Sequence, residues 1–326
     1  MRFNPKARLD RGQVRDSGRG GGGLGGGLGR GGGRAQRLPI PSGVGTKGGI
    51  GTIIIVVILY FVLSRCLGGD GGLGGQLGTG AGGGPEMDAS QVEGSGRYDE
   101  CRTGEDANNS ADCARVAVVN SIQDYWGDSL EGLSGTPYQP AVTHTFSGSV
   151  GTGCGNATSQ VGPFYCPADG TVYLDTTFFD AVLERQLGGP DGGFVEYYVI
   201  GHEYGHHVQN LLGTMGRVRT QQGPESDAVR LELQADCYAG MWARNATSTD
   251  DDSGQALIAE LTEEDIRLAI EAAEAVGDDR IQEKTSGRVN PEAWTHGSSE
   301  QRNRWFMTGY QSGDLSACDT FSAASL

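Results

Sequence analysis

The sequence predicts an α+β domain, mainly helical with a small sheet, that follows a single transmembrane helix. Three observations lead to this prediction. The 57 glycines of the 326-residue chain are spread unevenly, and two tracts, residues 17–34 and 68–84, are mostly glycine. An apolar run lies between these tracts. The remaining block, residues 98–326, carries long amphipathic segments and one short region with a strand-like pattern, and it is long enough to bury a core of its own.

The first 97 residues divide into three parts. Residues 1–49 and 67–97 are rich in glycine and bury too little apolar surface to offset the backbone entropy lost on folding, so we predict a disordered tail and a flexible linker. Between them, the run IGTIIIVVILYFVL predicts a transmembrane anchor over residues 50–66. A cleaved signal peptide is the alternative, but its charged leader would be 49 residues long and no small-residue cleavage site follows.

The distribution of charge predicts how this anchor is oriented. Residues 1–49 carry a net charge of +8, whereas the rest of the chain carries −24. Because basic flanks stay on the cytoplasmic side, we expect a cytoplasmic N-terminus and an acidic C-terminal domain outside the cytoplasmic membrane. An acidic domain repels nucleic acid, so we expect no nucleic-acid partner, and the membrane is bound through the one N-terminal helix.

Cysteine usage agrees with an extracytoplasmic domain. Six cysteines follow the anchor, an even number that suits disulfide formation in an oxidising compartment. A cysteine zinc site is the alternative, but the chain has no C-x-x-C spacing. We expect two local pairs and one long-range pair, namely Cys101–Cys113, Cys154–Cys166 and Cys237–Cys318.

The stretch VIGHEYGHHVQNLLG, residues 199–213, holds three of the five histidines of the chain. Apolar residues recur around it with helical spacing, so we predict a helix that Gly213 ends. Residues four apart share one face of a helix, so His202 and His206 can bind one metal ion, while Glu203 can act on a water molecule as general base. His207 points about 100° away and is expected to hydrogen-bond elsewhere.

Two histidines of a buried helix can also be satisfied by carbonyl groups, so a metal site needs a third ligand. The stretch AVRLELQADCYAGMWARNA, residues 228–246, places Glu232 and Asp236 on one face of an otherwise apolar helix. A buried carboxylate needs a metal ion or a donor as partner. We expect Glu232 to complete a His-His-Glu zinc site that keeps a position for water, and Asp236 to accept a ring N–H of a ligating histidine. Solvated acids paired with Arg230 or Arg244 are the alternative.

The chain contains the blocks HEYGHHVQNLLG, ELQADCYAGMWA, CGNATSQVGPFYCPADGTVYLD, THGSSEQRNRWFMTGY and CDTF. In matching order, these five blocks resemble the Putative neutral zinc metallopeptidases of bacteria, a membrane-anchored family. The resemblance covers roughly residues 98–322 and implies a zincin-like fold, more distantly similar to gluzincins with a second Glu-x-x-x-Asp motif. It implies Zn²⁺ as cofactor, with His202, His206 and Glu232 as ligands and Glu203 as general base. It also implies that Asp236 contacts a ligand without binding the metal itself.

A zinc peptidase also needs a donor for the oxyanion and a surface for the substrate. His296 is the first candidate donor, ahead of Tyr204 and Arg302, although a histidine that caps the following helix is the alternative. The stretch GPFYCPADGTVYLD predicts two strands around a turn at residues 167–170. In zincin-like folds a strand beside the active-site helix binds extended substrate, a role we assign to residues 171–174, with an ordinary hairpin as the alternative.

Further along, LTEEDIRLAIEAAEAVGDDRIQ predicts one amphipathic helix that begins at Thr262. The acids of STDDDSG lack the ligand spacing of a calcium loop and are expected to be solvated.

Together these observations predict zinc-assisted hydrolysis of peptide bonds, with a peptide or protein as substrate, outside the cytoplasmic membrane. Two alternatives remain. One is a scaffold protein that holds zinc without turnover, which a closed fourth coordination position would favour. The other is an amidase that acts on cell-wall peptides with the same residues.

Overall fold

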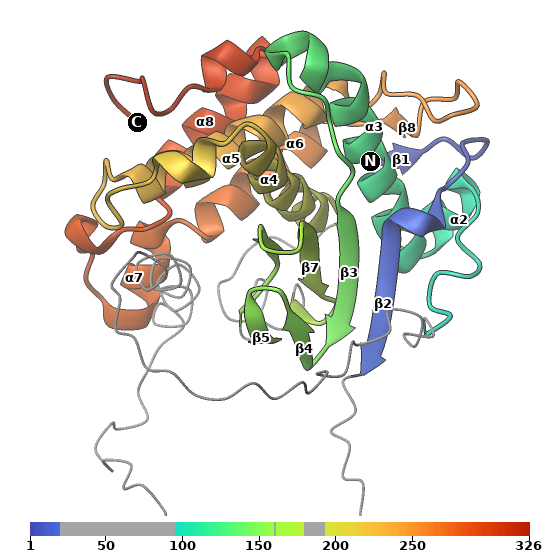
Figure 1. The fold of residues 1–326 in the computed structure, drawn as a ribbon, viewed down its shortest axis with the longest axis horizontal. Helices are drawn as coiled ribbons and strands as arrows, with labels where there is room; N and C mark the ends of the chain where they lie inside the picture. Colours follow the sequence, from blue (N-terminus) through green and yellow to red (C-terminus); the bar gives the residue numbers. More distant parts are fainter. Residues whose placement is uncertain (20–94, 160, 179–192) are drawn as a thin grey trace, which may run out of the picture.

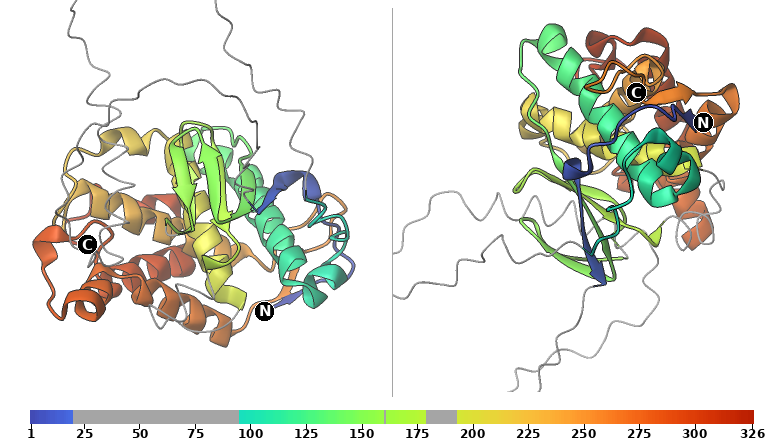
Figure 2. Two further views of the ribbon diagram at one scale, coloured as in Figure 1. Left: turned by 90° about the horizontal axis from the view of Figure 1, so that it is seen from below. Right: turned by 90° about the vertical axis from the view of Figure 1, so that its right-hand side faces the viewer.

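The computed structural model describes residues 1–19, 95–159, 161–178 and 193–326, and within them it is an α+β fold dominated by helices (Figure 1). The helices gather into one body, and strands β2, β3 and β7 lie along one side of it, as the turned views also show (Figure 2). The helices are α2 (Gly104–Asn109), α3 (Ala111–Ser134), α4 (Gly193–Leu211), α5 (Asp227–Asn245), α6 (Glu263–Ala275), α7 (Asp278–Ser286) and α8 (Ser299–Ser312). Short 3₁₀ helices cover Arg11–Gln13, Thr214–Arg217, Pro291–Ala293 and Leu315–Cys318.

The described strands form one four-stranded sheet and two two-stranded pairs. In the larger sheet the order is β2-β3-β7-β6, where β2 and β3 are each parallel to the next strand and β6 is antiparallel to β7. The hairpin of β4 and β5 packs beside this sheet, and β1 pairs with β8. Their bounds are β1 (Arg2–Phe3), β2 (Val14–Arg19), β3 (Val142–Ser147), β4 (Ser149–Thr152), β5 (Gly155–Thr158), β6 (Phe164–Cys166), β7 (Thr171–Asp175) and β8 (Ile258–Glu260).

The two helices predicted to carry the metal site are present as α4 and α5. Ser226 caps α5 by accepting a hydrogen bond from the N–H of Val229, which satisfies one of the free amides at the helix start. The predicted helix from Thr262 begins with a capping box, but it breaks at Gly277 into α6 and α7. A Cβ atom at Gly277 would lie 2.5 Å from the backbone nitrogen of Ser299, so the close approach of α8 requires glycine at the break.

Helix α5 lies between α4 and α8 at backbone contact distance. A Cβ atom at Gly205 of α4 would lie 2.8 Å from the carbonyl oxygen of Ala235, and one at Gly309 of α8 would lie 1.8 Å from that of Cys237. Glycine therefore allows the three helices to approach closely where the predicted metal ligands lie. The described core is one large cluster of apolar side chains around these helices, with a smaller cluster under the β4–β5 hairpin.

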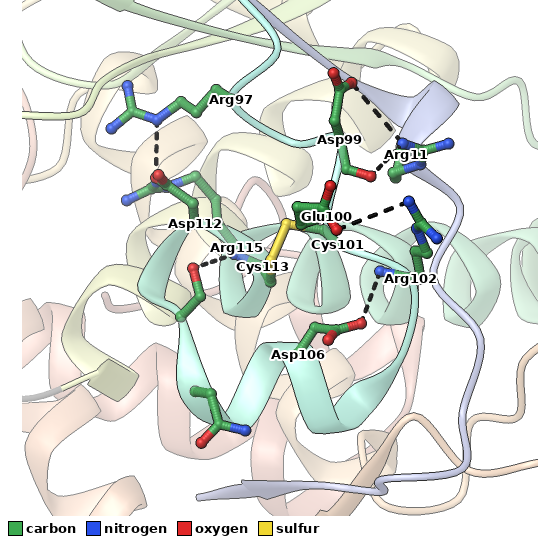
Figure 3. Close-up of a disulfide and its surroundings, with 12 residues drawn as sticks. Arg11, Arg97, Asp99, Glu100, Cys101, Arg102, Asp106, Asp112, Cys113 and Arg115 are labelled. Carbon is green, nitrogen blue, oxygen red and sulfur yellow. Dashed lines mark hydrogen bonds and ion pairs between the residues drawn. A yellow bond between two sulfur atoms is a disulfide. The ribbon is translucent and has the colours of Figure 1, made fainter.

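All three predicted disulfides are present: Cys101–Cys113, Cys154–Cys166 and Cys237–Cys318. The first joins the segment before α2 to the start of α3 (Figure 3). Two arginines bind beside it, because Arg11 donates to the carbonyl oxygen of Asp99 at 2.6 Å and Arg97 pairs with Asp112 at 2.9 Å. The third disulfide ties α5 to the C-terminal end of the chain.

The prediction that residues 1–49 are disordered is wrong for residues 1–19, which pack on the domain. Phe3 is buried, and the backbone N–H and C=O of this residue both bind the side-chain amide of Asn108. The backbone of Asp10 makes the same paired contact with Asn120. This segment is polar and has no strand-like pattern of its own; its order comes from strand edges more than a hundred residues away. Residues 20–49 lie outside the described residues.

This packing also bears on the predicted orientation across a membrane. Residues 1–19 cannot pair with β3 and β8 from the opposite side of a bilayer, so this packing is not compatible with a cytoplasmic location of the segment and a domain outside. The predicted anchor, residues 50–66, and the linker up to residue 94 lie outside the described residues. Among the helices of the described ranges, none is long and apolar enough to cross a membrane.

Candidate metal centre

Helices α4 and α5 bring together the three predicted ligands. The Nε2 atoms of His202 and His206 lie 3.3 Å and 3.6 Å from the carboxylate oxygens of Glu232. The two rings stand nearly perpendicular, with centroids 4.7 Å apart. One ligand atom from each of the three residues lies within 4.8 Å of the others, a spacing that one metal ion can bridge.

The second nitrogen of each imidazole is held by an acceptor, which turns Nε2 toward Glu232. Nδ1 of His202 lies 2.8 Å from Asp236, as predicted, and Nδ1 of His206 lies 2.9 Å from the Oε1 atom of Gln209. The amide nitrogen of Gln209 donates to the carbonyl oxygen of Leu231 at 2.7 Å, so its oxygen is the atom that faces the histidine. Both rings therefore carry their proton on Nδ1 and offer the Nε2 lone pair to a metal.

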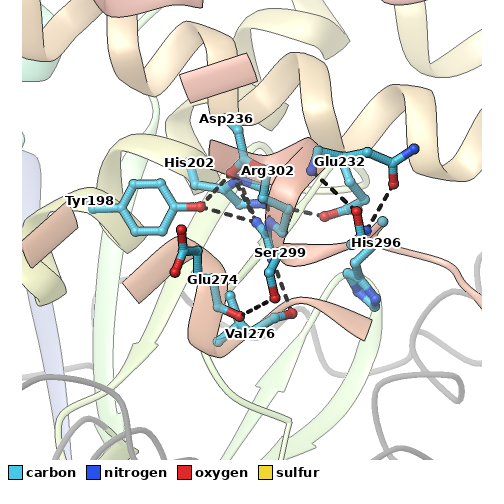
Figure 4. A network of polar contacts seen from close by, with 12 residues as sticks. Tyr198, His202, Glu232, Asp236, Glu274, Val276, His296, Ser299 and Arg302 are labelled. Atoms are coloured by element: carbon cyan, nitrogen blue, oxygen red, sulfur yellow. Dashed lines mark hydrogen bonds and ion pairs between the residues drawn. The ribbon is translucent and has the colours of Figure 1, made fainter. Parts of the chain in front are cut away.

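Asp236 is fully buried and accepts four hydrogen bonds (Figure 4). Besides His202, the donors are the hydroxyl of Tyr198 at 2.5 Å and two nitrogens of Arg302 at 2.8 and 2.9 Å. Burial alone would raise the pKa of Asp236, but the charge of Arg302 and the ring of His202 lower that pKa to about 2. The alternative pairing of these acids with Arg230 or Arg244 does not occur: Arg230 and Arg244 bind backbone carbonyl oxygens near the C-terminus.

Glu203 lies next to the ligands and not among them. Glu203 is 7% exposed, and the backbone of Tyr165 in β6 lies near its carboxylate. Burial raises the pKa of the Glu203 carboxyl above its ordinary value, because the ionised form loses water. A carboxylate in this environment suits a general base that must take up and return a proton.

His296 lies beside Glu232 at the edge of the centre (Figure 4). Burial alone would lower the pKa of His296, but the carboxylates of Glu232 and Asp278 raise it. Asp278 also fixes the backbone of this loop, because one of its oxygens accepts the N–H groups of Thr295, His296 and Gly297 at 2.7, 2.6 and 3.1 Å. The loop thus holds His296 near the ligands, where it remains the candidate oxyanion donor.

The other two candidate oxyanion donors, Tyr204 and Arg302, hydrogen-bond other side chains of the protein. Tyr204 is fully buried, and its hydroxyl lies 2.8 Å from the hydroxyl of Thr143 in β3. The guanidinium of Arg302 is bound to Asp236. His207, as predicted, faces away from the metal ligands: it hydrogen-bonds the Tyr165 hydroxyl at 3.1 Å and a backbone carbonyl oxygen at 2.6 Å.

The two strands around the turn at residues 167–170 are β6 and β7, but the role assigned to residues 171–174 is wrong. Strand β7 is hydrogen-bonded to β3 on one side and to β6 on the other, so it has no free edge for a substrate. Among the described strands, β6 forms one edge of this sheet and β2 forms the other, and all three residues of β6 are buried. Because the backbone of Tyr165 lies near Glu203, β6 passes close to the metal centre.

Sequence reasoning missed Gln209, Tyr165 and Asp278 and misassigned Arg302. For Gln209 a signal existed, since it follows His206 by three residues on the same helix and shares its face. The other three come from β6, α7 and α8, and their place at the site depends on the tertiary fold.

A mostly helical α+β domain in which an H-E-x-x-H helix meets a glutamate from a second helix defines a protein with a zinc-type metal centre. The comparison with known families is more specific. The chain belongs to the Putative neutral zinc metallopeptidase family, whose profile matches residues 1–321. The match begins at the first residue, in agreement with the packing of residues 1–19 on the domain.

Two relatives are similar over most of the domain. The uncharacterized protein Rv2575 of Mycobacterium tuberculosis is 54% identical over 229 residues, which cover 70% of this chain and 76% of the relative. The uncharacterized protein YpfJ of Escherichia coli K12 is 43% identical over 210 residues, 63% of this chain and 69% of the relative. No solved structure matches the chain.

Proposed function

We propose that this chain is a zinc-dependent peptidase with a zincin-like site that hydrolyses peptide bonds outside the cytoplasm. The observation that carries the proposal is the convergence of His202, His206 and Glu232, with the buried Glu203 directly after His202 on α4. Two imidazoles and one carboxylate are the donor set of catalytic zinc sites, which leave a position open for water. The family description supports zinc as the metal.

In the proposed reaction, the residues at the site have separate roles. A bound zinc ion would supply polarisation of the scissile carbonyl and would make a water molecule acidic. Glu203 takes the proton of that water and returns it to the leaving amine. His296 donates a hydrogen bond to the oxygen that becomes negative.

An oxidising compartment is supported by the three disulfides, of which two close short loops and one joins α5 to the C-terminal region. Peptides or proteins outside the cytoplasm are the expected substrates.

The test compares the full-length chain with Glu203→Gln. Because Glu203 is not a ligand, the variant should keep the zinc content of the parent, measured by elemental analysis. Its rate on a mixture of fluorogenic peptides should fall by at least about 100-fold, the usual effect of losing a general base. Glu283→Gln, an exposed position of α7, is the matched control and should retain full activity.

Equal rates for the parent and Glu203→Gln would contradict the mechanism. A zinc-loaded parent that cleaves no peptide would favour the scaffold alternative. Turnover confined to cell-wall peptides would favour the amidase.

A further inference from the structure

Arg302 lies behind the metal ligands on α8 and touches both Asp236 and the ring of His202. It is only 4% exposed. Its Nε and Nη2 atoms donate to the two different oxygens of Asp236 at 2.8 and 2.9 Å, and Nη2 also lies 3.2 Å from the hydroxyl of Tyr198 and 3.4 Å from Nδ1 of His202. Figure 4 shows the side chains of Arg302, Tyr198 and His202 gathered around the carboxylate of Asp236.

The two-point contact restricts Asp236 in a way that His202 cannot. A carboxylate held by one histidine and one hydroxyl can still rotate about its Cβ–Cγ bond. The planar guanidinium fixes both oxygens at once, and its permanent charge compensates the buried carboxylate whether or not a metal is present. With Asp236 fixed, the direction of the His202 ring is fixed as well, because Nδ1 must point at Oδ1.

We propose that Arg302 is a positioning residue of the metal centre, which acts on the His202 ligand through Asp236. The proposal rests on the metal site of the proposed function and not on peptide hydrolysis. The proposal predicts the direction in which zinc affinity changes when Arg302 is replaced. A guanidinium close to a metal cation repels it, so removal of the charge by itself would tighten metal binding. Loss of the positioning contact would weaken it.

The experiment measures zinc affinity of the full-length protein by competition with a chromophoric chelator. The variants are Arg302→Met, Asp236→Asn and the double variant that carries both changes. We expect Arg302→Met and Asp236→Asn each to weaken zinc binding by roughly 10- to 100-fold, the usual range for a group that orients a ligand. Because Arg302 acts through Asp236, the double variant should bind zinc about as weakly as Asp236→Asn alone. Arg304→Met, which removes a half-exposed arginine of the same helix, should bind zinc like the parent.

A purely structural role for Arg302 is tested by cobalt substitution. The visible absorption of bound Co²⁺ depends on ligand directions, so Arg302→Met should change this spectrum while Arg304→Met does not. A single variant that leaves an unpaired buried charge can fail to fold. In that case the zinc affinity of the double variant, which removes both charges together, tests the proposal. Zinc affinity in the double variant equal to that of the parent would overturn the proposal. An Arg302→Met protein that binds zinc as tightly as the parent, or more tightly, with an unchanged cobalt spectrum, would do the same.

These measurements use no substrate. A parent that binds zinc as expected but cleaves no peptide would therefore contradict the proposed function and leave the role of Arg302 intact.

Discussion

At the scale of single residues, the centre depends on acceptors that hold the far nitrogen of each histidine. Asp236 comes from α5 and binds His202, whereas Gln209 comes from α4 itself and binds His206. The two acceptors differ in charge. A carboxylate makes its imidazole a stronger donor to the metal than a neutral amide does, so His202 and His206 are chemically unequal ligands.

Replacing Gln209 with methionine tests the weaker of these two contacts. The change removes the acceptor at Nδ1 of His206 and leaves a side chain of similar volume, so zinc affinity should fall by about 10-fold. Gln311→Met, at an exposed position of α8, should not change it. The measurement is a zinc titration against a chelator, and unchanged affinity in Gln209→Met would show that His206 needs no partner at Nδ1.

Asp278 provides a prediction about pH. Burial alone would raise the pKa of Asp278, but His296 and the backbone N–H groups of its loop lower it. A carboxyl group with a lowered pKa stabilises the fold fully above its unfolded pKa, near 3.9, and loses this contribution as the pH falls through its folded pKa. Asp278→Asn should therefore have a lower Tm than the parent at pH 7, and the difference should shrink below about pH 4. A difference that stays constant from pH 7 to pH 3 would contradict this.

The residue types at the centre could be predicted because histidine and buried acids at helical spacing are rare combinations. His202, His206, Glu203, Glu232 and Asp236 all lie where their spacing indicated. Arginine and tyrosine are common in helices and strands, so nothing in the local pattern distinguishes Arg302 or Tyr165 from surface or core residues.

At the scale of elements, the position of Glu232 and Asp236 depends on how closely α5 approaches its two neighbours. Periodicity predicted α4 and α5, and the turn at residues 167–170 predicted β6 and β7. Local pattern did not predict that β7 lies inside the described sheet and β6 at one edge of it, because edges depend on strand order. Nor did it predict the break at Gly277, because the reason for that glycine lies in α8.

Substitution of Gly309 tests the spacing of α5 and α8. In Gly309→Ala the new methyl group would lie 1.8 Å from the carbonyl oxygen of Cys237, so the helices must separate. Overpacking of this kind costs about 1–3 kcal/mol or more, and the free energy of unfolding should fall by at least that amount. Zinc affinity should fall with it, because Arg302 moves with α8 and Asp236 stays on α5.

Gly132→Ala is the matched control, because Gly132 lies in α3 with nothing within 4 Å of a new Cβ atom. This change should be neutral or should stabilise the protein by about 0.5–1 kcal/mol. The free energies of unfolding of both variants are compared by urea unfolding with and without zinc. Equal values for the two variants would mean that α5 and α8 accommodate the added methyl group without loss of stability.

At the scale of the whole molecule, residues 1–19 and the disulfide-bonded domain form one folded unit. Strand β2 is the outer strand of the sheet that also contains β6, and β1 pairs with β8. The N-terminal ammonium group pairs with Asp265, the residue that completes the capping box of α6. If the chain crossed a membrane once between residues 19 and 95, these contacts could not form, so the packing and a single crossing exclude each other.

We therefore predict that residues 1–19 occupy the same oxidising compartment as the domain. Arg2 and Glu260 face each other across the antiparallel β1–β8 pair, where directly opposed Cα atoms are about 4.5–5.5 Å apart, within the range of a disulfide. In cells that make the full-length Arg2→Cys/Glu260→Cys variant, with thiols blocked at lysis, the two cysteines should be joined. Cleavage between residues 20 and 94 should then release two fragments only under reducing conditions, whereas each single variant should release them under both. Free thiols at both positions of the double variant would mean that residues 1–19 stay in the cytoplasm and that the domain folds without them.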